Sequence, residues 1–382
     1  MSGRDAVAIL PTGGGKSVTY QLPAVAGGRC ALVVSPLVAL MRDQVDAARR
    51  RGLRAAVIDS TVSTEVRGQA LRSLRSRHMD LLYAAPEGLP RLAGELAGAG
   101  VFGLFAVDEA HCISQWGYDF RPDYLLLADA RARVAPDAPV LAVTATATRR
   151  VENDIACALR LRDPFVFRGS FFRPNLKLAA FRKDGVRDAR LVVAALLEAH
   201  AGQAAIVYCV SRSGAASLAS WLTRRGVPSQ AYHAGLDPAR RAEVQDAFLA
   251  GACRVVVATV AFGMGVDKPD VRLVVHADLP GSLEAYAQEV GRAGRDGGDS
   301  DCVLLYSWAD VRRRDGLARD LPPERRAVVR ASLREMYRFA ATGCCRHRIL
   351  CAHFDERTPV PCAACDACGA ISATRLLRAG GW

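Results

Sequence analysis

The sequence lacks the features of a membrane or secreted protein. Its longest apolar runs have the length of a strand, far short of the roughly 20 consecutive apolar residues of a membrane-spanning helix. No secretory signal is visible, because residues 1–5 lead straight into a short apolar run that is followed by Pro11 and a glycine cluster. We therefore expect a soluble, cytoplasmic protein with no membrane partner.

The chain is also short of acidic residues relative to basic ones. It carries 51 Lys and Arg against 39 Asp and Glu, a formal net charge of +12. The excess is concentrated in residues 311–350, which hold eleven Arg against four acidic residues. A basic patch of this density suits a phosphate backbone, although a solvated helix face gives the same pattern. At 382 residues the chain is long for one hydrophobic core, so we expect about two or three domains.

The twelve cysteines fall into two groups. Those up to Cys302 are scattered among apolar strands and loops, where buried, reduced thiols are expected. The others lie between Cys344 and Cys368, and two-residue spacers separate three of them, which lets sulfurs meet tetrahedrally on Zn²⁺. We predict a structural zinc site, since four thiolates leave no open position for catalysis. The predicted ligands are Cys345, Cys362, Cys365 and Cys368. Alternatives for the first ligand are Cys344, Cys351, His347 and His353.

A glycine-rich segment follows the first expected strand, residues 6–10. It reads Pro-Thr-Gly-Gly-Gly-Lys-Ser and leads into a helix-compatible segment. In a phosphate-binding loop of this kind, backbone N–H groups wrap the phosphate oxygens, Lys16 reaches the β and γ phosphates, and the Ser17 hydroxyl is placed for Mg²⁺. The strict pattern has glycine where this chain has Leu10, and a glycine-rich turn without a nucleotide is the alternative. The predicted phosphate-binding residues are Thr12, Gly13, Gly14, Gly15, Lys16 and Ser17.

Strand-like apolar runs alternate with helix-compatible segments through most of the chain. This alternation indicates the α/β class, with parallel sheets covered by helices on both faces. The first set of expected strands covers residues 6–10, 30–34, 55–58, 80–83, 101–107 and 140–144. The pattern breaks at residues 164–175, where we place a domain boundary. The second set covers residues 176–181, 204–209, 229–232, 253–258, 271–276 and 301–306.

Residues 107–124 combine two kinds of chemistry. An Asp-Glu pair ends a buried-strand pattern, and open α/β sheets bind their ligands at the carboxyl ends of strands. Trp116, Phe120 and Arg121 then offer ring faces and a guanidinium in an ordered loop. An ATP site that leads into a base-stacking loop would couple the two activities, whereas a packed hydrophobic turn is the alternative for the aromatic residues.

The second half of the chain has no phosphate-binding loop. It has two other glycine-containing segments, residues 257–267 and 288–296. Arg292 and Arg295 lie in the second of these, and two arginines near a helix end are suited to reach a neighbouring γ-phosphate. A basic surface turn is the alternative.

These motifs together resemble the RecQ family of superfamily 2 DNA helicases over nearly the whole chain. The resemblance rests on the phosphate loop, DEAH, the aromatic loop, TATAT, VATVAFGMGVDKP, QEVGRAGRDG and the cysteine quartet. It implies two tandem RecA-like parallel-sheet domains that close on ATP and Mg²⁺, followed by a small helical zinc-binding subdomain. The implied divisions are residues 1–170, 171–308 and 309–372, with a tail at 373–382.

The resemblance also implies roles for individual residues. The implied catalytic residues are Lys16, Asp108, Glu109, Arg292 and Arg295. Mg²⁺ would be held by Ser17 and Asp108. The implied coupling residues are His111, Gln115, Thr144, Thr146 and Gln288. The implied DNA-binding residues are Trp116, Phe120 and Arg121. Glu109 would position or deprotonate the attacking water, and the two arginines would act from the second domain.

We therefore expect an ATP-dependent 3′–5′ DNA helicase or translocase that acts in DNA repair and recombination. It would be a monomer that binds single-stranded DNA and junctions, in a bacterial cytoplasm at the nucleoid. Three departures from the family pattern bear on this expectation: no adenine-gripping segment precedes the phosphate loop, no winged helix follows Cys368, and Tyr118 replaces a common His. A DNA-binding protein with weak or no unwinding is the alternative. An RNA helicase fits the ATPase motifs but neither the aromatic loop nor the zinc spacing.

Overall fold

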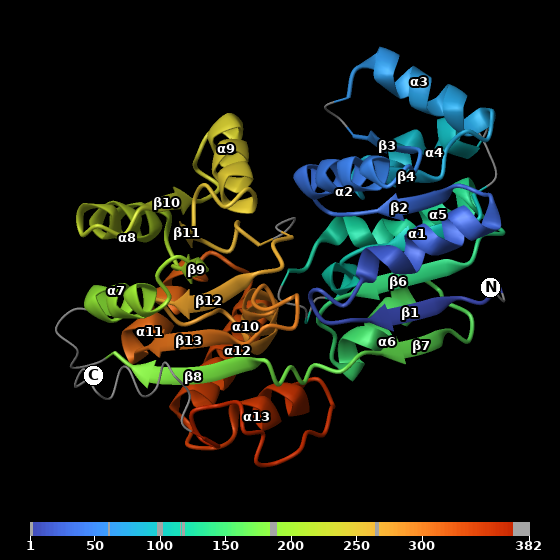
Figure 1. Ribbon diagram of the computed structural model, residues 1–382. Helices are drawn as coiled ribbons and strands as arrows, with labels where there is room; N and C mark the ends of the chain where they lie inside the picture. Colours follow the sequence, from blue (N-terminus) through green and yellow to red (C-terminus); the bar gives the residue numbers. More distant parts are fainter. Residues whose placement is uncertain are drawn as a thin grey trace. The chain divides into compact units, whose positions relative to one another are not determined.

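The chain divides into two compact units, Met1–Gly169 and Ser170–Trp382. The computed structural model describes residues 3–59, 62–97, 102–114, 116, 119–183, 189–263 and 267–369. Each unit has its own parallel sheet flanked by helices, which confirms the predicted α/β class (Figure 1). Among the described residues, no helix is both long and apolar enough to cross a bilayer.

The first unit is built on a seven-stranded parallel sheet in the order β3-β4-β2-β5-β6-β1-β7. Its strands are β1 (Ala6–Ile9), β2 (Ala31–Val34), β3 (Ala55–Ile58), β4 (Leu81–Ala84), β5 (Leu104–Val107), β6 (Val140–Thr144) and β7 (Phe165–Arg168). The inner strands β2, β4, β5 and β6 are buried along their whole length, as parallel strands covered on both faces are. All six strands predicted for this half of the chain form.

The helices of the first unit begin at polar caps where the sequence supplies them. Ser63 and Thr148 accept hydrogen bonds from the N–H groups of Val66 and Val151 and so begin α3 and α6. The α-helices are α1 (Lys16–Gly27), α2 (Val38–Arg50), α3 (Thr64–Arg75), α4 (Leu89–Ala97), α5 (Leu127–Val134) and α6 (Arg149–Ala158). Two 3-10 helices, η1 (Ala110–Ile113) and η2 (Pro122–Leu126), lie between β5 and α5.

The second unit is built on a six-stranded parallel sheet in the order β10-β11-β9-β12-β13-β8. Its strands are β8 (Leu176–Arg182), β9 (Ala204–Tyr208), β10 (Ser229–Tyr232), β11 (Val255–Ala258), β12 (Val271–His276) and β13 (Ser300–Tyr306). The helices between these strands are α7 (Ala189–Ala199), α8 (Arg212–Arg224), α9 (Pro238–Leu249) and α10 (Leu283–Val290). The six strands predicted for this half also form.

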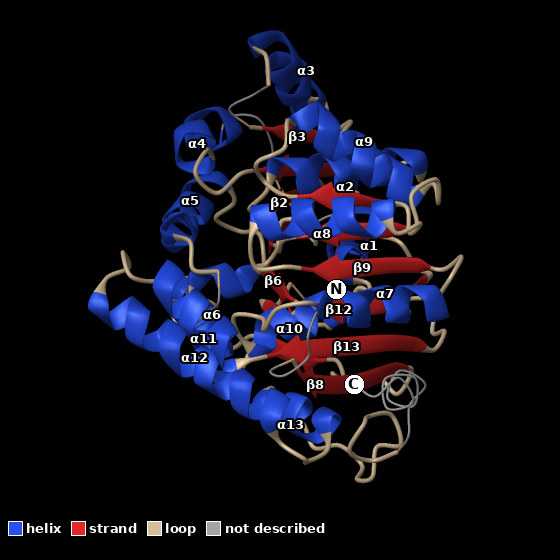
Figure 2. Cartoon of the chain, turned by 90° about the vertical axis from the view of Figure 1, so that its left-hand side faces the viewer, coloured by secondary structure: helices blue, strands red, loops and turns tan. Residues whose placement is uncertain are grey.

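Three further helices follow the second sheet: α11 (Trp308–Leu317), α12 (Pro323–Ala341) and α13 (Arg346–His353). A reciprocal cap between Ser307 and Asp310 begins α11. The long helix α12 packs against α11, α13 and the strands β8 and β13 (Figure 2). After α13 the chain returns to the sheet, where the N–H of Leu178 donates to the Ala364 carbonyl at 3.0 Å. The segment that carries Cys362, Cys365 and Cys368, called the cysteine segment below, therefore covers the outer edge of β8. The predicted boundary after residue 308 stays a prediction.

β7 is the one described strand of the first unit that the sequence did not predict. It lies in the segment interpreted as a boundary, and it pairs with β1 at the edge of the sheet. Phe165 and Phe167 are exposed, so β7 lacks the buried apolar pattern that marks the other strands.

The two units are joined at the peptide bond between Gly169 and Ser170. The Gly169 N–H donates to the last carbonyl of β1 at 2.8 Å, within the first unit. In the second unit, the Ser170 hydroxyl and the Phe171 N–H donate to the carboxylate of Glu356 at 2.5 and 2.6 Å. Each side of the junction is thus held to its own unit.

Candidate functional site

Residues 11–17 form a turn that leads directly from β1 into α1. Gly13 and Gly15 have φ angles of 84° and 79°, a left-handed conformation that side chains disfavour. The N–H of Gly14 donates to the Pro11 carbonyl, and a Cβ on Gly14 would lie 2.9 Å from that oxygen. The path of the turn therefore requires all three glycines. It ends at a helix N-terminus, whose free N–H groups and dipole attract phosphate.

Lys16 lies beside the carboxylate of Glu109. Their Nζ and Oε1 atoms are 4.0 Å apart, and both side chains are largely buried. Glu109 follows β5 and has a φ of 47°, which is uncommon for a residue other than glycine and recurs at functional sites. The preceding residue, Asp108, is also buried, and its Oδ1 accepts a hydrogen bond from the Glu109 N–H at 2.9 Å. The end of β5 thus places two acids next to the glycine turn.

Polar contacts continue from Glu109 to the end of β6. The Nδ1 atom of His111 lies 3.3 Å from Glu109 Oε2 and 2.9 Å from the Thr144 hydroxyl. That hydroxyl also accepts a hydrogen bond from the Thr146 N–H at 3.4 Å. All four residues are buried. The structure therefore brings three of the predicted coupling residues together with the predicted water-positioning acid.

The two adjacent acids form a site suited to a divalent cation. Burial and the neighbouring Glu109 raise the pKa of Asp108 to about 7, although Lys16 opposes the shift. A cation that binds the Asp108 carboxylate would relieve this unfavourable burial of charge. Hard oxygen donors are what Mg²⁺ prefers, and the residues that could hold it are Ser17 and Asp108.

Arg121 attaches the loop after η1 to the rest of the first unit. Its guanidinium donates to the Pro36 carbonyl at 2.8 Å and to Asp119 Oδ2 at 3.2 Å. The Sγ of Cys112 lies 3.8 Å from the same Asp119 oxygen. Arg121 therefore has protein partners that fix the loop, and its contact with DNA stays a prediction. The neighbouring Phe120 is half-buried.

Among the described residues of this loop, Trp116 is an exposed aromatic residue, with 47% of its surface accessible. The Cζ of Arg150, in α6, lies 3.5 Å from the centre of its ring, which is a cation–π contact. The Trp116 N–H donates to the Ser114 hydroxyl, which in turn donates to Asp154 of α6 at 2.5 Å. Sequence reasoning missed Arg150, whose only signal was its position just after the TATAT motif. Gln115, Gly117 and Tyr118 lie outside the described residues.

In the second unit, the two predicted finger arginines follow α10, which carries Gln288. Arg292 is 7% exposed, and the Nη1 of Arg295 pairs with Asp267 at 2.6 Å. Burial and the proximity of Arg292 lower the pKa of Arg295 to about 10. Two guanidinium groups held this close repel each other, and an anion near both would relieve the repulsion.

Gly294 gives the turn between these arginines its shape. It has a φ of 52°, and a Cβ there would lie 2.5 Å from both the Asn175 amide nitrogen and the Gly298 carbonyl. The side-chain amide of Asn175 donates to the carbonyls of Gly294 and Gly298 at 3.0 Å each. The guanidinium of Arg173 donates to the Ala293 carbonyl at 3.1 Å. Sequence reasoning gave no role to Arg173 or Asn175.

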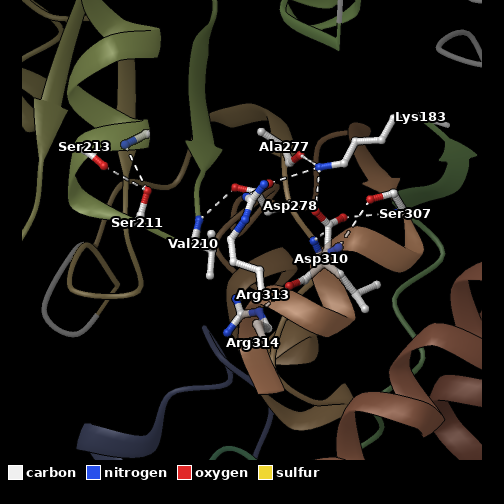
Figure 3. A network of polar contacts seen from close by, with 12 residues as sticks. Lys183, Val210, Ser211, Ser213, Ala277, Asp278, Ser307, Asp310, Arg313 and Arg314 are labelled. Carbon is white, nitrogen blue, oxygen red and sulfur yellow. Dashed lines mark hydrogen bonds and ion pairs between the residues drawn. The ribbon is translucent and has the colours of Figure 1, made fainter. Parts of the chain in front are cut away.

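A further polar cluster lies at the carboxyl ends of the strands in the second sheet (Figure 3). The Nζ of Lys183 lies 3.0 Å from carboxylate oxygens of Asp278 and Asp310. Asp278 also pairs with Arg313 of α11 at 3.1 Å and accepts a hydrogen bond from the Val210 N–H at 3.0 Å. Burial would raise the pKa of Asp278, but Lys183 and Arg313 hold it below its usual value. The cluster ties α11 to the sheet.

The four predicted zinc ligands meet in the structure. The Sγ atoms of Cys345, Cys362, Cys365 and Cys368 lie within 4.8 Å of one another. Tetrahedral zinc with Zn–S bonds of about 2.3 Å separates its sulfurs by about 3.8 Å, so the quartet fits this ion. Burial would raise the pKa of the Cys345 thiol, but the Arg348 N–H and the other cysteines lower it. Burial and the neighbouring cysteines instead raise the pKa of Cys362 and Cys368.

Among the alternatives for the first zinc ligand, the structure places Cys345 in the quartet. Cys345 is buried in the quartet, whereas Cys344 is exposed. The Nε2 of His347 lies 3.0 Å from the Leu176 carbonyl, and His353 lies between two glutamates. Cys351 is buried but does not belong to the quartet.

Three family models match successive parts of the chain. A DEAD/DEAH box helicase model matches residues 1–154, a helicase conserved C-terminal domain model matches residues 188–297, and a RecQ zinc-binding model matches residues 308–369. Together with the glycine turn, the paired acids and the cysteine quartet, these matches define the class as a two-domain helicase core followed by a zinc-binding segment.

Curated relatives identify the family within this class. The chain is 40% identical over 372 residues to "ATP-dependent DNA helicase RecQ" of Pasteurella multocida, covering 96% of this chain and 58% of that protein. It is 39% identical to "Putative ATP-dependent DNA helicase Q1" of Caenorhabditis elegans, covering 96% of this chain and 59% of that protein. The chain belongs to the RecQ family, and it spans about six tenths of the length of these relatives.

Solved helicase structures share the fold. The chain resembles Mycobacterium smegmatis Lhr bound to single-stranded DNA and AMP-PNP, with a TM-score of 0.61 and 24% identity over 81% of this chain and 45% of that one. It also resembles Saccharomyces cerevisiae Dbp5 bound to RNA and ADP BeF3, with a TM-score of 0.63 and 16% identity over 86% of this chain and 89% of that one. These similarities confirm two tandem domains of the helicase type.

Proposed function

We propose that this protein is an ATP-dependent DNA helicase or translocase that moves 3′ to 5′ on single-stranded DNA, in DNA repair and recombination. The observation that carries the proposal is the buried series of contacts from Lys16 through Glu109 and His111 to Thr144. It connects the phosphate-binding turn to an acid that can orient water, and connects that acid to a strand end that can respond to the nucleotide. The names of the relatives support the same activity.

Hydrolysis would begin with the ATP phosphates on the N–H groups of the glycine turn and on Lys16 Nζ. Mg²⁺, held by Ser17 and Asp108, would neutralise charge on the phosphates. Glu109 would orient a water molecule and accept its proton as the water oxygen bonds to the γ-phosphorus. The bond from that phosphorus to the oxygen bridging the β and γ phosphates would break, which leaves ADP and inorganic phosphate.

Arg292 and Arg295 would stabilise the negative charge that develops on the transferred phosphoryl group. These arginines belong to the second unit, whereas the glycine turn belongs to the first. Hydrolysis would therefore require the two units to come together. The residues that would report the nucleotide state are His111, Gln115, Thr144, Thr146 and Gln288.

The loop after η1 would contact single-stranded DNA. The exposed ring of Trp116 would stack on a base, an interaction that tolerates any sequence because every base has a π face. Phe120 and Arg121 would complete the contact. The bonds from Ser114 to Asp154 and from Arg121 to Pro36 attach this loop to the first unit, so a shift of the loop could reach the nearby acids.

The decisive experiment measures ATP hydrolysis by the purified chain with and without single-stranded DNA. We expect strong stimulation by DNA, weaker stimulation by RNA, and a loss of at least about 100-fold in Lys16→Ala, since this lysine contacts the reacting phosphates. Lys177→Ala, which removes a lysine that pairs with Asp299 in the second unit, is the matched control and should leave the rate unchanged. Absence of DNA stimulation together with an unaffected Lys16→Ala protein would refute the proposal.

Finer features of the function are proposed on the same basis. We propose action at single-/double-strand junctions by a monomer, in the cytoplasm at the nucleoid, and a division into residues 1–170, 171–308 and 309–372 with a tail at 373–382. A non-catalytic DNA-binding protein is not favoured, because DNA binding without ATP hydrolysis does not require a buried acid that contacts both a lysine and a histidine.

A further inference from the structure

His353 is the last residue of α13, and it lies between two carboxylates. Its Nε2 is 2.9 Å from Glu284 Oε1 in α10, and its Nδ1 is 2.9 Å from Glu335 Oε1 in α12. The His353 and Glu284 side chains are only 12% and 17% exposed, whereas that of Glu335 is 49% exposed. The pair with Glu284 is therefore the better shielded from water.

The imidazole of His353 is charged at neutral pH. Burial would lower its pKa, but the contacts with Glu284 and Glu335 raise it to about 10. The same pairing holds the pKa of Glu284 below its usual value despite burial. A cation at the carboxyl end of α13 is also favoured by the dipole of that helix.

The two ends of α13 lead to different sites. At its first turn, the sulfur of Cys345, a member of the zinc quartet, accepts a hydrogen bond from the Arg348 N–H at 3.4 Å. At its last residue, His353 holds Glu284. An eight-residue helix is about 12 Å long, so α13 forms a short rigid connection between the quartet and α10.

α10 in turn leads directly into the turn that carries the two finger arginines. Glu284 lies in its first turn, and Arg292 follows two residues after its end. Near that end, Glu289 pairs with His276 of β12 at 2.8 Å. In the middle of the helix, the ring of Tyr286 packs against Phe339 of α12, with centroids 5.2 Å apart. α10 is thus attached to the sheet near the arginines. At its start it is attached to α12 and α13, which together with the cysteine segment are called the zinc-binding region.

We propose that His353 is a positioning residue for ATP hydrolysis: by holding Glu284, it fixes α10 on the zinc-binding region and sets the position of the Arg292–Arg295 turn. The inference rests on the proposed function, because it assigns these arginines to the transition state. ATP hydrolysis would then depend on zinc occupancy through α13 and His353, although the quartet itself contains none of the residues that would contact ATP.

The test compares single variants of the full chain with a double variant. We expect His353→Gln and Glu284→Gln each to lower kcat of DNA-stimulated ATP hydrolysis about tenfold with an unchanged KM for ATP, because displaced arginines weaken only the transition state. The double variant should be no worse than either single one, since both remove the same contact. His353→Lys keeps the positive charge and should recover part of the loss. Glu335→Gln, which removes the exposed partner of the same imidazole, is the matched control and should change kcat less than twofold.

A second readout needs no hydrolysis. Hydrogen exchange in residues 283–292 should quicken in His353→Gln, while exchange in α13 and the zinc content stay as in the unmodified protein. Loss of zinc, or quickened exchange in α13 with α10 unaffected, would assign His353 a purely structural role and overturn the inference. Unchanged kcat and unchanged exchange in α10 would overturn it as well. If DNA does not stimulate hydrolysis by the unmodified protein, the proposed function fails, and the exchange of α10 alone then decides whether His353 positions this helix.

Discussion

At the scale of single residues, Glu109 adopts a left-handed φ of 47°, and this conformation accompanies its contacts with both Lys16 and His111. Two contacts between segments far apart in the chain hold the aromatic loop: Arg121 donates to the Pro36 carbonyl, and Arg150 covers the Trp116 ring.

Removal of the Trp116 ring should uncouple DNA binding from hydrolysis. Trp116→Ala is expected to keep the basal ATPase rate, because the ring contacts none of the acids. It should weaken single-stranded DNA binding roughly 5- to 150-fold, since one stacked base is worth about 1–3 kcal/mol. Titration of ATPase stimulation with an oligonucleotide measures both quantities. Trp116→Phe retains a stacking face and serves as the control, and an Ala variant that responds to DNA normally would place the contact elsewhere.

Gly294 should tolerate no side chain. Gly294→Ala combines a left-handed φ with contacts of 2.5 Å to Asn175 and Gly298, and we expect a loss of about 2–4 kcal/mol in unfolding free energy. Gly297→Ala is the matched control, because its φ of 85° is similar but a Cβ there meets nothing within 4 Å, so the cost should be about 1 kcal/mol. Urea midpoints of the two variants provide the comparison, and equal midpoints would contradict the packing argument.

At the scale of elements, burial decided which strands could be predicted. The twelve predicted strands form, and their central members have the continuous apolar runs of parallel strands buried on both faces. β7 escaped prediction because it is an edge strand with exposed Phe165 and Phe167. The pairing of the cysteine segment with β8 escaped as well, since the four thiolates predicted a metal site but not the surface on which it rests.

Zinc removal should free the edge of the second sheet. The N–H groups of Leu178 and Ala180 donate to the cysteine segment, to the Ala364 carbonyl and the Asp366 carboxylate, at 3.0 Å each. Chelation is expected to unfold this segment, because metal binding supplies its folding free energy, and to quicken amide exchange at both positions. The N–H of Ala205, in β9 of the same sheet, is the internal control. Full protection of β8 after chelation would show that the segment folds without metal.

The ion pairs of His353 should give the second unit a defined pH dependence. The folded-state pKa of this residue is raised to about 10 from an ordinary value of about 6.5. Its stabilisation is therefore complete below about pH 6.5 and is lost as the pH rises toward 10. We expect the difference in unfolding free energy between the unmodified protein and His353→Gln to be largest near pH 6 and to shrink steadily up to pH 10. A difference that grows with pH would contradict the assignment of charge.

At the scale of the whole molecule, the sequence predicted the two sheets and the cysteine quartet but not how the parts act together. Each sheet follows from local apolar periodicity, and the quartet follows from cysteine spacing. Contacts between distant segments, such as those of His353 with α10 and α12, depend on packing that no local pattern encodes. The site roles of Arg292 and Arg295 therefore stay predictions.

The arginine turn offers a direct test of cooperation between the units. We expect Arg292→Ala to lower kcat for ATP hydrolysis roughly 10³-fold while ATP still binds, since an arginine finger acts on the transition state and not on ground-state affinity. Binding of a fluorescent ATP analogue and steady-state rates measure the two effects. Arg224→Ala, on the exposed end of α8, is the control and should leave both unchanged. Parallel losses of nucleotide affinity and rate would point to a role in nucleotide binding.

At the junction between Gly169 and Ser170, hydrogen bonds hold the residue on each side of one peptide bond, one to β1 and the other to Glu356. Because these anchored residues are adjacent in the chain, backbone rotation at the junction is confined to a few bonds. Residues inserted between Gly169 and Ser170 would therefore add backbone freedom that the chain lacks at this point.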